Sequence, residues 1–214
     1  DAGAILIMEV DGLEAGIDTE ADRITQIAMK HGAREVRKAD TDAKRTLLWK
    51  ARKQAFGAVG RLASSFCTQD GVVPRSKLPH ILREIQRIGL KYDLKICNVF
   101  HAGDGNLHPL ILFDANDPDQ LHRCELFGAD ILETSVAMGG TVTGEHGVGV
   151  EKLNSMCVQF SPEENALMFG VKRAFDTKEL LNPGKVIPTL QRCAENGKML
   201  VRGGRLSFPE LPRF

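Results

Sequence analysis

The sequence predicts an α+β fold in which a mostly antiparallel sheet is covered by helices. Two observations lead to this prediction. Short segments rich in β-branched and aromatic residues alternate with longer segments whose apolar residues recur at helical spacing. In the middle of the chain an Asp-Gly pair lies between two such β-rich segments, which is a strong hairpin signal and implies antiparallel pairing. Since no linker or change of composition divides the chain, we expect one domain.

The N-terminal part is expected to contain two strands and two helices. Residues 4–10 are an apolar run closed by Asp-Gly, which indicates a strand. A helix is predicted over 18–30, because an aspartate can cap its start and its apolar residues fall on one face. Residues 35–39 are a short strand candidate. A second helix, over 42–52, begins at a threonine or aspartate cap and ends before two glycines.

The middle of the chain is expected to supply most of the sheet. Residues 64–73 alternate between polar and apolar and end at a proline, as a strand does. A helix over 76–90 begins at a serine cap and carries isoleucines and leucines at helical spacing. The strands of the hairpin are predicted over 94–100 and 110–113.

The C-terminal part is expected to be mainly helical. A helix over 118–138 begins with proline at its first position and stops at Gly-Gly. A short strand follows over 141–143, and residues 151–156 fit a helical turn. Ser-Pro-Glu-Glu begins the last helix, over 162–175, and 181–185 is a loop.

Composition excludes several classes of protein. The 214 residues are 43% hydrophobic and 26% charged, which is ordinary for a globular protein, and the formal net charge is +0. With no basic stripe, nucleic acid is not expected as a partner. The apolar runs are too short to span a bilayer. The five cysteines form no CxxC motif and predict reduced thiols in a cytoplasmic protein.

The histidines on either side of the hairpin turn predict a metal site. With Asp104-Gly105 at the turn, His101 is expected opposite His108. Directly opposed residues point to one face with Cβ atoms ~4.5–5.5 Å apart, so the two imidazoles would converge as transition-metal ligands do. The alternative is that both are half-buried polar residues of a strand. Asp104 is interpreted as a turn residue rather than a ligand.

A second group of polar residues follows the short strand at 141–143. Glu145 and His146 lie between glycines, which allow a ligand to come close to the backbone. Glu145 would add a carboxylate to the two histidines, and three protein ligands with one open position are typical of catalytic zinc. His146 would remain as a general base. The alternative, which the spacing leaves open, is that Glu145 pairs with a cation and His146 caps a turn.

Two further residues are weaker candidates, and the other histidines are not assigned to the site. Arg52 can bind a carboxylate in a bidentate manner if it faces the pocket, but most arginines on helices are solvated. Asn182 lies in an Asn-Pro-Gly-Lys segment that is more often a plain turn.

Three segments together resemble the C-terminal domain of FAD-linked oxidases, the flavoprotein group of the vanillyl-alcohol-oxidase type that includes D-lactate and D-2-hydroxyglutarate dehydrogenases. They are His-Ala-Gly-Asp-Gly-Asn-Leu-His at 101–108, Gly-Glu-His-Gly at 144–147 and Leu-Asn-Pro-Gly-Lys at 181–185. Residues 108–114 and 208–214 are similar to the FAD-linked subunits of bacterial glycolate oxidases in particular. The resemblance covers nearly the whole chain.

The resemblance implies a ferredoxin-like cap domain over residues 1–190, followed by a tail over 191–214. The cap would cover an N-terminal FAD-binding domain that is absent from this chain, as a start within a predicted strand and without Met also suggests. The whole enzyme would oxidise glycolate to glyoxylate and pass a hydride to FAD. Partner subunits, one flavoprotein-like and one iron–sulfur, would carry electrons to the inner face of the membrane. The isolated chain is expected to be inactive, since it has no Gly-rich loop for the FAD pyrophosphate.

The resemblance also implies roles for individual residues. His101, His108 and Glu145 would hold a divalent metal, for which zinc is favoured, although iron and manganese accept the same ligands. His146 would be the catalytic base. Arg52 would bind the substrate carboxylate, and Asn182 would approach the isoalloxazine ring of FAD.

Leu110 departs from the pattern of the hydroxyglutarate enzymes, which carry an asparagine there. By strand alternation Leu110 shares a face with His108 and is expected to line the pocket. An apolar side chain cannot hydrogen-bond a second carboxylate, which favours a short 2-hydroxy acid. D-Lactate therefore stays an alternative to glycolate. A third alternative is a metal-binding or subunit-docking module with no chemistry of its own.

Overall fold

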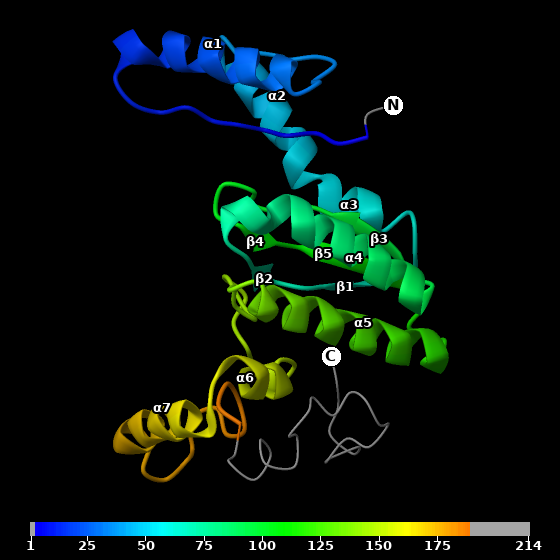
Figure 1. Cartoon of the computed structure of the whole chain (residues 1–214), viewed down its shortest axis with the longest axis vertical. Helices are drawn as coiled ribbons and strands as arrows, with labels where there is room; N and C mark the ends of the chain where they lie inside the picture. The colour runs from blue at the N-terminus through cyan, green and yellow to red at the C-terminus, as the bar shows by residue number, and fades with distance from the viewer. Residues whose placement is uncertain (1–2, 189–214) are drawn as a thin grey trace. The chain divides into compact units, whose positions relative to one another are not determined.

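The computed structural model describes residues 3–188 (Figure 1). The chain divides into two compact units, one up to Ala58 and one from Val59 onward. The tail expected over 191–214 lies outside the described residues.

The first unit consists of helices and extended segments. It contains α1 (Glu14–Lys30), α2 (Asp42–Lys53) and most of α3 (Ala55–Val59). The cap of α2 is as predicted, because the side chain of Thr41 accepts a hydrogen bond from the backbone of Lys44. The strands predicted over 4–10 and 35–39 are wrong: both segments lack a strand to pair with in the described part of this unit. The first segment is instead attached to α2 through Glu9, which accepts a hydrogen bond from Trp49 Nε1 at 2.8 Å.

The second unit is built on an antiparallel sheet, which confirms the α+β prediction. The strands are β1 (Ser65–Thr68), β2 (Gly71–Val72), β3 (Lys95–Asn98), β4 (Asn106–Leu107) and β5 (Pro109–Phe113). β5 lies between β1 and β3, and β4 pairs with β2. Helix α4 (Leu78–Tyr92) follows β2, and α5 (Pro118–Ala137) follows β5. The short strand predicted over 141–143 is reduced to a single bridge between Thr141 and Val72. The resulting β-α-β-β-α order, closed by that bridge, is the ferredoxin-like arrangement.

The strand predicted over 64–73 is split in two, and Pro109 gives the reason. β1 pairs with β5 and β2 pairs with β4 in one continuous register, so Gln69 stands opposite Pro109 and Asp70 opposite His108. Gln69 donates its backbone N–H to the Pro109 carbonyl at 3.0 Å. Proline has no N–H to return, so the ladder is interrupted at this pair. The interruption lies beside Asp70 and His108.

One face of the sheet packs against α4 and α5 (Figure 1). Buried apolar residues from the sheet and from both helices form a core between them. They are Val73, Ile81, Ile85, Ile88, Leu94, Leu107, Ile111, Cys124, Phe127 and Ile131. His108 falls between Leu107 and Pro109, so it projects from the opposite face. The opposite face carries Asp70 and His108 together with the buried Leu110.

The remaining helices follow the sheet. A 3-10 turn (Arg75–Lys77) precedes α4, and α6 (Leu153–Gln159) replaces the helical turn predicted over 151–156. α7 (Pro162–Phe175) has the predicted capping box between Ser161 and Glu164. Within residues 3–188, every helix is too short or too polar to cross a membrane.

The cysteines differ in one respect from the prediction. Cys67, Cys97 and Cys124 are free thiols. Cys157, however, is disulfide-bonded, so the expectation of reduced thiols throughout is wrong at this position. The odd number of cysteines and the absence of a CxxC motif did not rule out a disulfide bond.

Candidate metal centre

The sheet places His108 beside Asp70. In the continuous register the two residues face each other across neighbouring strands, and both side chains are almost completely buried, at 4% and 0% exposed. The Nε2 atom of His108 lies 3.6 Å from Oδ1 of Asp70. Sequence reasoning missed Asp70. The available signal was a charged residue inside a predicted strand, where aspartate is depleted.

The hairpin places His101 on the same face as His108, but in a different register from the one predicted. His101 pairs with Asn106 rather than with His108, because the turn spans residues 102–105 instead of Asp104-Gly105 alone. The slip is two residues, and side chains alternate with a period of two, so the face is unchanged. The two imidazole rings are 5.3 Å apart between centroids and perpendicular. The two histidines therefore converge, but as a diagonal pair across the strands and not as a directly opposed pair.

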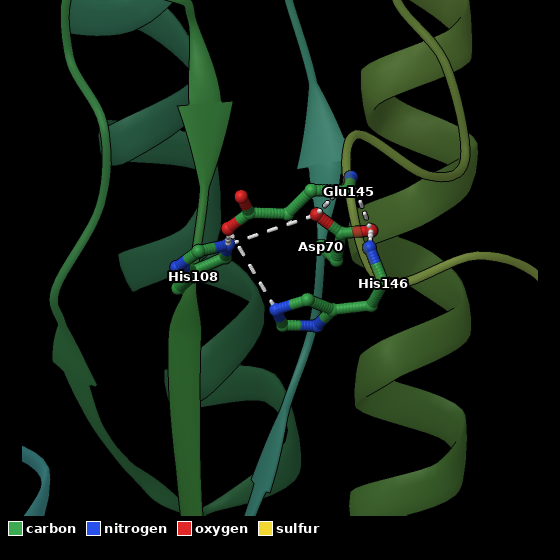
Figure 2. A group of neighbouring side chains, drawn as sticks. All are labelled: Asp70, His108, Glu145 and His146. Carbon is green, nitrogen blue, oxygen red and sulfur yellow. Dashed lines mark hydrogen bonds and ion pairs between the residues drawn. The ribbon is translucent and has the colours of Figure 1, made fainter.

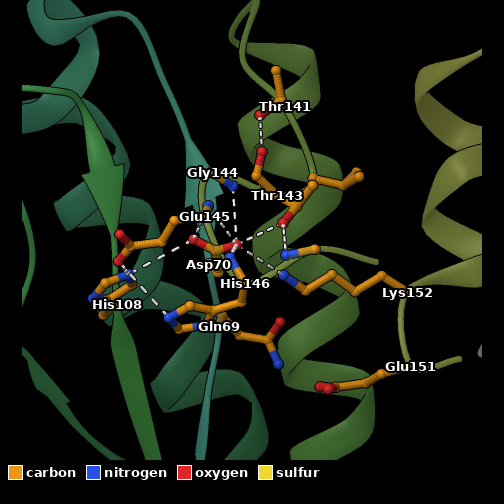
Figure 3. Close-up of polar contacts among 12 residues, drawn as sticks. Gln69, Asp70, His108, Thr141, Thr143, Gly144, Glu145, His146, Glu151 and Lys152 are labelled. Carbon is orange, nitrogen blue, oxygen red and sulfur yellow. Dashed lines mark hydrogen bonds and ion pairs between the residues drawn. The ribbon is translucent and has the colours of Figure 1, made fainter. Parts of the chain in front are cut away.

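The segment from Thr143 to Gly147 wraps around the carboxylate of Asp70 (Figure 3). Oδ2 of Asp70 accepts hydrogen bonds from the Thr143 hydroxyl at 2.6 Å and from the backbone N–H groups of Gly144 and His146, both at 2.9 Å. The N–H of Glu145 lies 3.2 Å from both carboxylate oxygens. Because the backbone is curled rather than extended, the side chains of Glu145 and His146 can reach the same point.

Electrostatics at Asp70 and His108 follow from this packing. Burial, the strongest single influence, raises the pKa of Asp70. The hydrogen bonds from Thr143 and from the backbone of His146, Gly144 and Glu145 outweigh it, so the pKa lies well below its ordinary value. Burial lowers the pKa of His108, with His146 acting in the same direction, whereas Glu145 and Asp70 oppose this. The site therefore combines an ionised aspartate with a neutral imidazole at neutral pH.

Four side chains bring ligand atoms together at this point (Figure 2). One ligand atom from each of Asp70, His108, Glu145 and His146 lies within 4.8 Å of the other three. Oε1 of Glu145 is central: it is 3.0 Å from Nε2 of His108, 3.8 Å from Nε2 of His146 and 3.6 Å from Nε2 of His101. The side chains of Glu145, His146 and His101 are about half exposed, so a small molecule can reach them.

The buried imidazole of His108 provides a test of whether a metal ion fits. Among the described residues, neither of its ring nitrogens has a hydrogen-bond partner. An unpaired buried polar atom is costly, and a nitrogen lone pair that faces a carboxylate oxygen at 3.0 Å is repulsive unless a proton or cation lies between them. A metal cation between the two atoms would satisfy both, because a neutral imidazole nitrogen and a carboxylate oxygen are both electron-pair donors. Imidazole nitrogens with a carboxylate oxygen are ligands that Zn²⁺ accepts.

The residues expected to form the pocket differ in their exposure. His108 is buried rather than accessible, because the paired strands enclose it on both sides. Leu110 shares its face, as predicted, but is 0% exposed, so it does not lie on an open surface. The exposed part of the site is formed by the loop residues and His101.

Arg52 and Asn182 are positioned by other parts of the chain. Arg52 lies on α2 in the first unit, where its guanidinium is 5.8 Å from the centre of the Phe56 ring. Asn182 lies in the expected loop and adopts a left-handed backbone conformation with φ 46°. The loop is connected to the segment after Gly147 by a hydrogen bond from the backbone of Val186 to Gly149 at 2.8 Å. The roles expected for both residues stay predictions.

Comparison with known proteins gives a consistent result. The chain is 52% identical over all 214 residues to glycolate oxidase subunit GlcD of Escherichia coli (strain K12), of which it covers 43%. It is 38% identical over 185 residues to glycolate oxidase subunit GlcD of Bacillus subtilis (strain 168), over 86% of this chain and 39% of that protein. It is also 32% identical over 193 residues to a probable mitochondrial D-lactate dehydrogenase of Danio rerio, over 89% of this chain and 39% of that protein.

The chain thus spans less than half the length of these curated relatives. The family model for FAD linked oxidases, C-terminal domain, matches residues 1–186. That match covers most of the chain, including both compact units and the polar cluster. The chain belongs to the FAD linked oxidase C-terminal domain family.

Proposed function

We propose that this chain is the substrate- and metal-binding part of a flavoprotein that oxidises glycolate to glyoxylate. The observation that carries the proposal is the convergence of three histidines and Glu145 on one accessible point, with the buried His108 lacking a hydrogen-bond partner among the described residues. The similarity to glycolate oxidase subunits supports the choice of reaction. Residues 1–190 would act as one cap domain, and the FAD-binding domain would lie outside this chain.

In this proposal His101, His108 and Glu145 hold a divalent metal, with zinc favoured over iron and manganese. Nε2 of His108 and Nε2 of His101 lie 3.0 Å and 3.6 Å from Oε1 of Glu145. Asp70 is close but its carboxylate already accepts several hydrogen bonds, so it is less suited to be a ligand. His146 is left with an imidazole that stacks on His108, at 4.8 Å between centroids, and it is half exposed.

His146 would act as the general base. Oxidation of a 2-hydroxy acid removes the hydroxyl proton and a hydride from the adjacent carbon. When bound, FAD supplies the hydride acceptor and the metal supplies positive charge near the substrate oxygens. Nε2 of His146 would take the hydroxyl proton, Arg52 would pair with the substrate carboxylate, and Asn182 would contact the flavin ring. The proton and the hydride thus leave the substrate by different routes, and a carbonyl remains.

D-Lactate oxidation is the second candidate function. D-Lactate dehydrogenases are also among the relatives, and D-lactate differs from glycolate by one methyl group. One methyl group changes specificity only by ~10–200-fold. A third candidate is a metal-binding or docking module without chemistry.

The names of two relatives, glycolate oxidase subunits of Escherichia coli and Bacillus subtilis, support the proposal that partner subunits exist. Other glycolate oxidase subunits, one flavoprotein-like and one iron–sulfur, would accept the electrons, and membrane association at the inner face would come through them.

Flavin reduction in the intact flavoprotein tests these candidates. Under anaerobic conditions, loss of flavin absorbance is followed after adding glycolate, D-lactate or D-2-hydroxyglutarate. We expect glycolate to give the highest kcat/KM and the dicarboxylate the lowest. Higher kcat/KM with D-lactate would favour the second candidate, and no reduction with any of the acids would favour the third.

A further inference from the structure

We propose that Asp70 is a positioning residue, which folds the segment from Thr143 to Gly147 around its carboxylate and thereby aims Glu145 and His146 at the metal centre. The inference rests on the proposed function of that centre. It assigns Asp70 a role through other residues, not as a ligand.

The hydrogen bonds of Asp70 define the course of this segment. Three successive backbone N–H groups, those of Gly144, Glu145 and His146, point at one carboxylate. A run of N–H groups around an anion is a backbone nest. Since the N–H groups are turned inward, the side chains of Glu145 and His146 are turned outward to the exposed side of the cluster.

Thr143 closes the nest at both ends. Its hydroxyl donates to Oδ2 of Asp70 at 2.6 Å and accepts from the backbone N–H of Gly147 at 2.9 Å. The same hydroxyl therefore connects the buried aspartate with the end of the segment. The segment has no regular secondary structure, so these bonds hold it in place.

Burial makes Asp70 a rigid anchor. Its side chain is 0% exposed, and it pairs with Lys152, whose Nζ lies 3.4 Å from Oδ2 and whose side chain is 5% exposed. A buried carboxylate needs hydrogen bonds and a counter-charge, and Asp70 has both. The anchor stands directly opposite His108, so it fixes the loop ligand relative to the strand ligand.

The competing role is direct metal ligation, because Oδ1 of Asp70 belongs to the group of converging ligand atoms. The two roles differ in the ligand set of the bound metal. If Asp70 positions the loop, Asp70→Asn should weaken metal binding but leave the absorption bands of Co²⁺, bound in place of Zn²⁺, like those of Thr143→Val. If Asp70 is a ligand, Asp70→Asn should change those bands, because they report which atoms coordinate the ion, whereas Thr143→Val should not.

The experiment measures Zn²⁺ affinity of the intact flavoprotein, stripped of metal, by competition with a chromophoric chelator. We expect Asp70→Asn to weaken binding by ~10–100-fold, as loss of an outer-shell partner typically does. Thr143→Val, which keeps the shape and loses the hydroxyl, should weaken it by ~3–10-fold. Thr143→Ser keeps a hydroxyl at this position and should bind Zn²⁺ like the parent.

A double variant separates the positioning role of Asp70 from its role in balancing the charge of Lys152. Asp70→Asn with Lys152→Met removes both charges, and we expect stability to recover while Zn²⁺ affinity stays low. Recovery of affinity together with stability would overturn the proposal, because Asp70 would then serve only to neutralise Lys152.

Asp176→Asn is the matched control, since Asp176 is also buried, pairs with a lysine and accepts backbone N–H groups, but its loop carries no proposed metal ligand. It should leave Zn²⁺ affinity unchanged. Parent-like affinity of Thr143→Val and Asp70→Asn would overturn the positioning role, and altered Co²⁺ absorption bands in Asp70→Asn but not in Thr143→Val would indicate a ligand. Should Asp70→Asn fail to fold, the Thr143 pair decides. Absence of Zn²⁺ binding by the parent would instead contradict the proposed metal centre itself.

Discussion

Gly144 is the first residue of the Gly-Glu-His-Gly segment, and replacing it by alanine should disturb the site through a steric contact. A Cβ atom at this position would lie 2.4 Å from Nδ2 of Asn106 and 2.9 Å from Cγ2 of Val72. Asn106 is buried on β4, so its side chain has little room to move away. Ordinary contact begins at 3.4 Å, so the loop or the strand must shift by about 1 Å (3.4 − 2.4).

This displacement has two consequences of different size. Overpacking of a buried contact costs ~1–3 kcal/mol, which corresponds to a fall of ~2–12 °C in the melting temperature of a chain of this length. A misplacement of ~1 Å in a catalytic group can cost ~10²-fold in rate. We therefore expect Gly144→Ala to lose much more activity than stability, with weaker Zn²⁺ binding because Glu145 follows directly.

The assay is glycolate-dependent flavin reduction in the intact flavoprotein, with thermal melting and Zn²⁺ titration of the same preparations. Gly170→Ala is the control, because Gly170 lies in α7 and a Cβ there would have no atom within 4 Å. Alanine at that position should raise stability by ~0.4–1 kcal/mol and leave Zn²⁺ affinity unchanged. If Gly144→Ala melts and binds Zn²⁺ like the parent, close packing at Gly144 is not what positions the loop.

Two other predictions concern the charged and basic residues. Glu145→Ala should lose metal and turnover together, whereas His146→Ala should keep the metal and lose ~10²–10⁴-fold in rate, as measured by metal content and flavin reduction; the opposite pattern would reverse the two roles. Lys172 is the main cause that lowers the pKa of Asp176, while burial opposes it. The ionised form thus stabilises the fold at pH values above the ordinary aspartate value, and this stabilisation is lost as the pH falls through the lowered pKa. Melting curves should show that Asp176→Asn is less stable than the parent at pH 7, with a difference that shrinks below about pH 4; a constant difference would refute the linkage.

The helices and the metal-binding face could be predicted from the sequence because both depend on local periodicity. The capping signals of α2, α5 and α7 and the apolar spacing of α4 describe interactions within one segment. The shared face of His101 and His108 also survived an error in the turn, because a slip of two residues preserves the strand face.

Features that depend on distant partners could not be predicted in the same way. An apolar run such as residues 4–10 becomes a strand only if another strand offers ladder partners, and the sequence does not say whether one does. Asp70 was overlooked because its partners at 143–146 are more than 70 residues away in the chain. The interruption of the sheet at Pro109 likewise required knowledge of the opposing residue.

Both loops assigned to the proposed chemistry are held by the same physical device. Asp70 accepts the N–H groups of Gly144 and His146 and pairs with Lys152. Asp176 accepts the N–H groups of Leu180 and Leu181, directly before Asn182, and pairs with Lys172.

Irregular loops do not satisfy their N–H groups through a ladder, and in each of these loops one buried carboxylate accepts several of them, with a lysine to balance its charge. This lets irregular backbone hold side chains in a fixed geometry, which catalysis requires. The hydrogen bond from Val186 to Gly149 then connects the two loops. On this argument Asp70 positions the proposed metal ligands and Asp176 positions the loop that carries Asn182. Substitution of Asp70 should therefore weaken metal binding, whereas, within the site, substitution of Asp176 should affect only the contact proposed for Asn182.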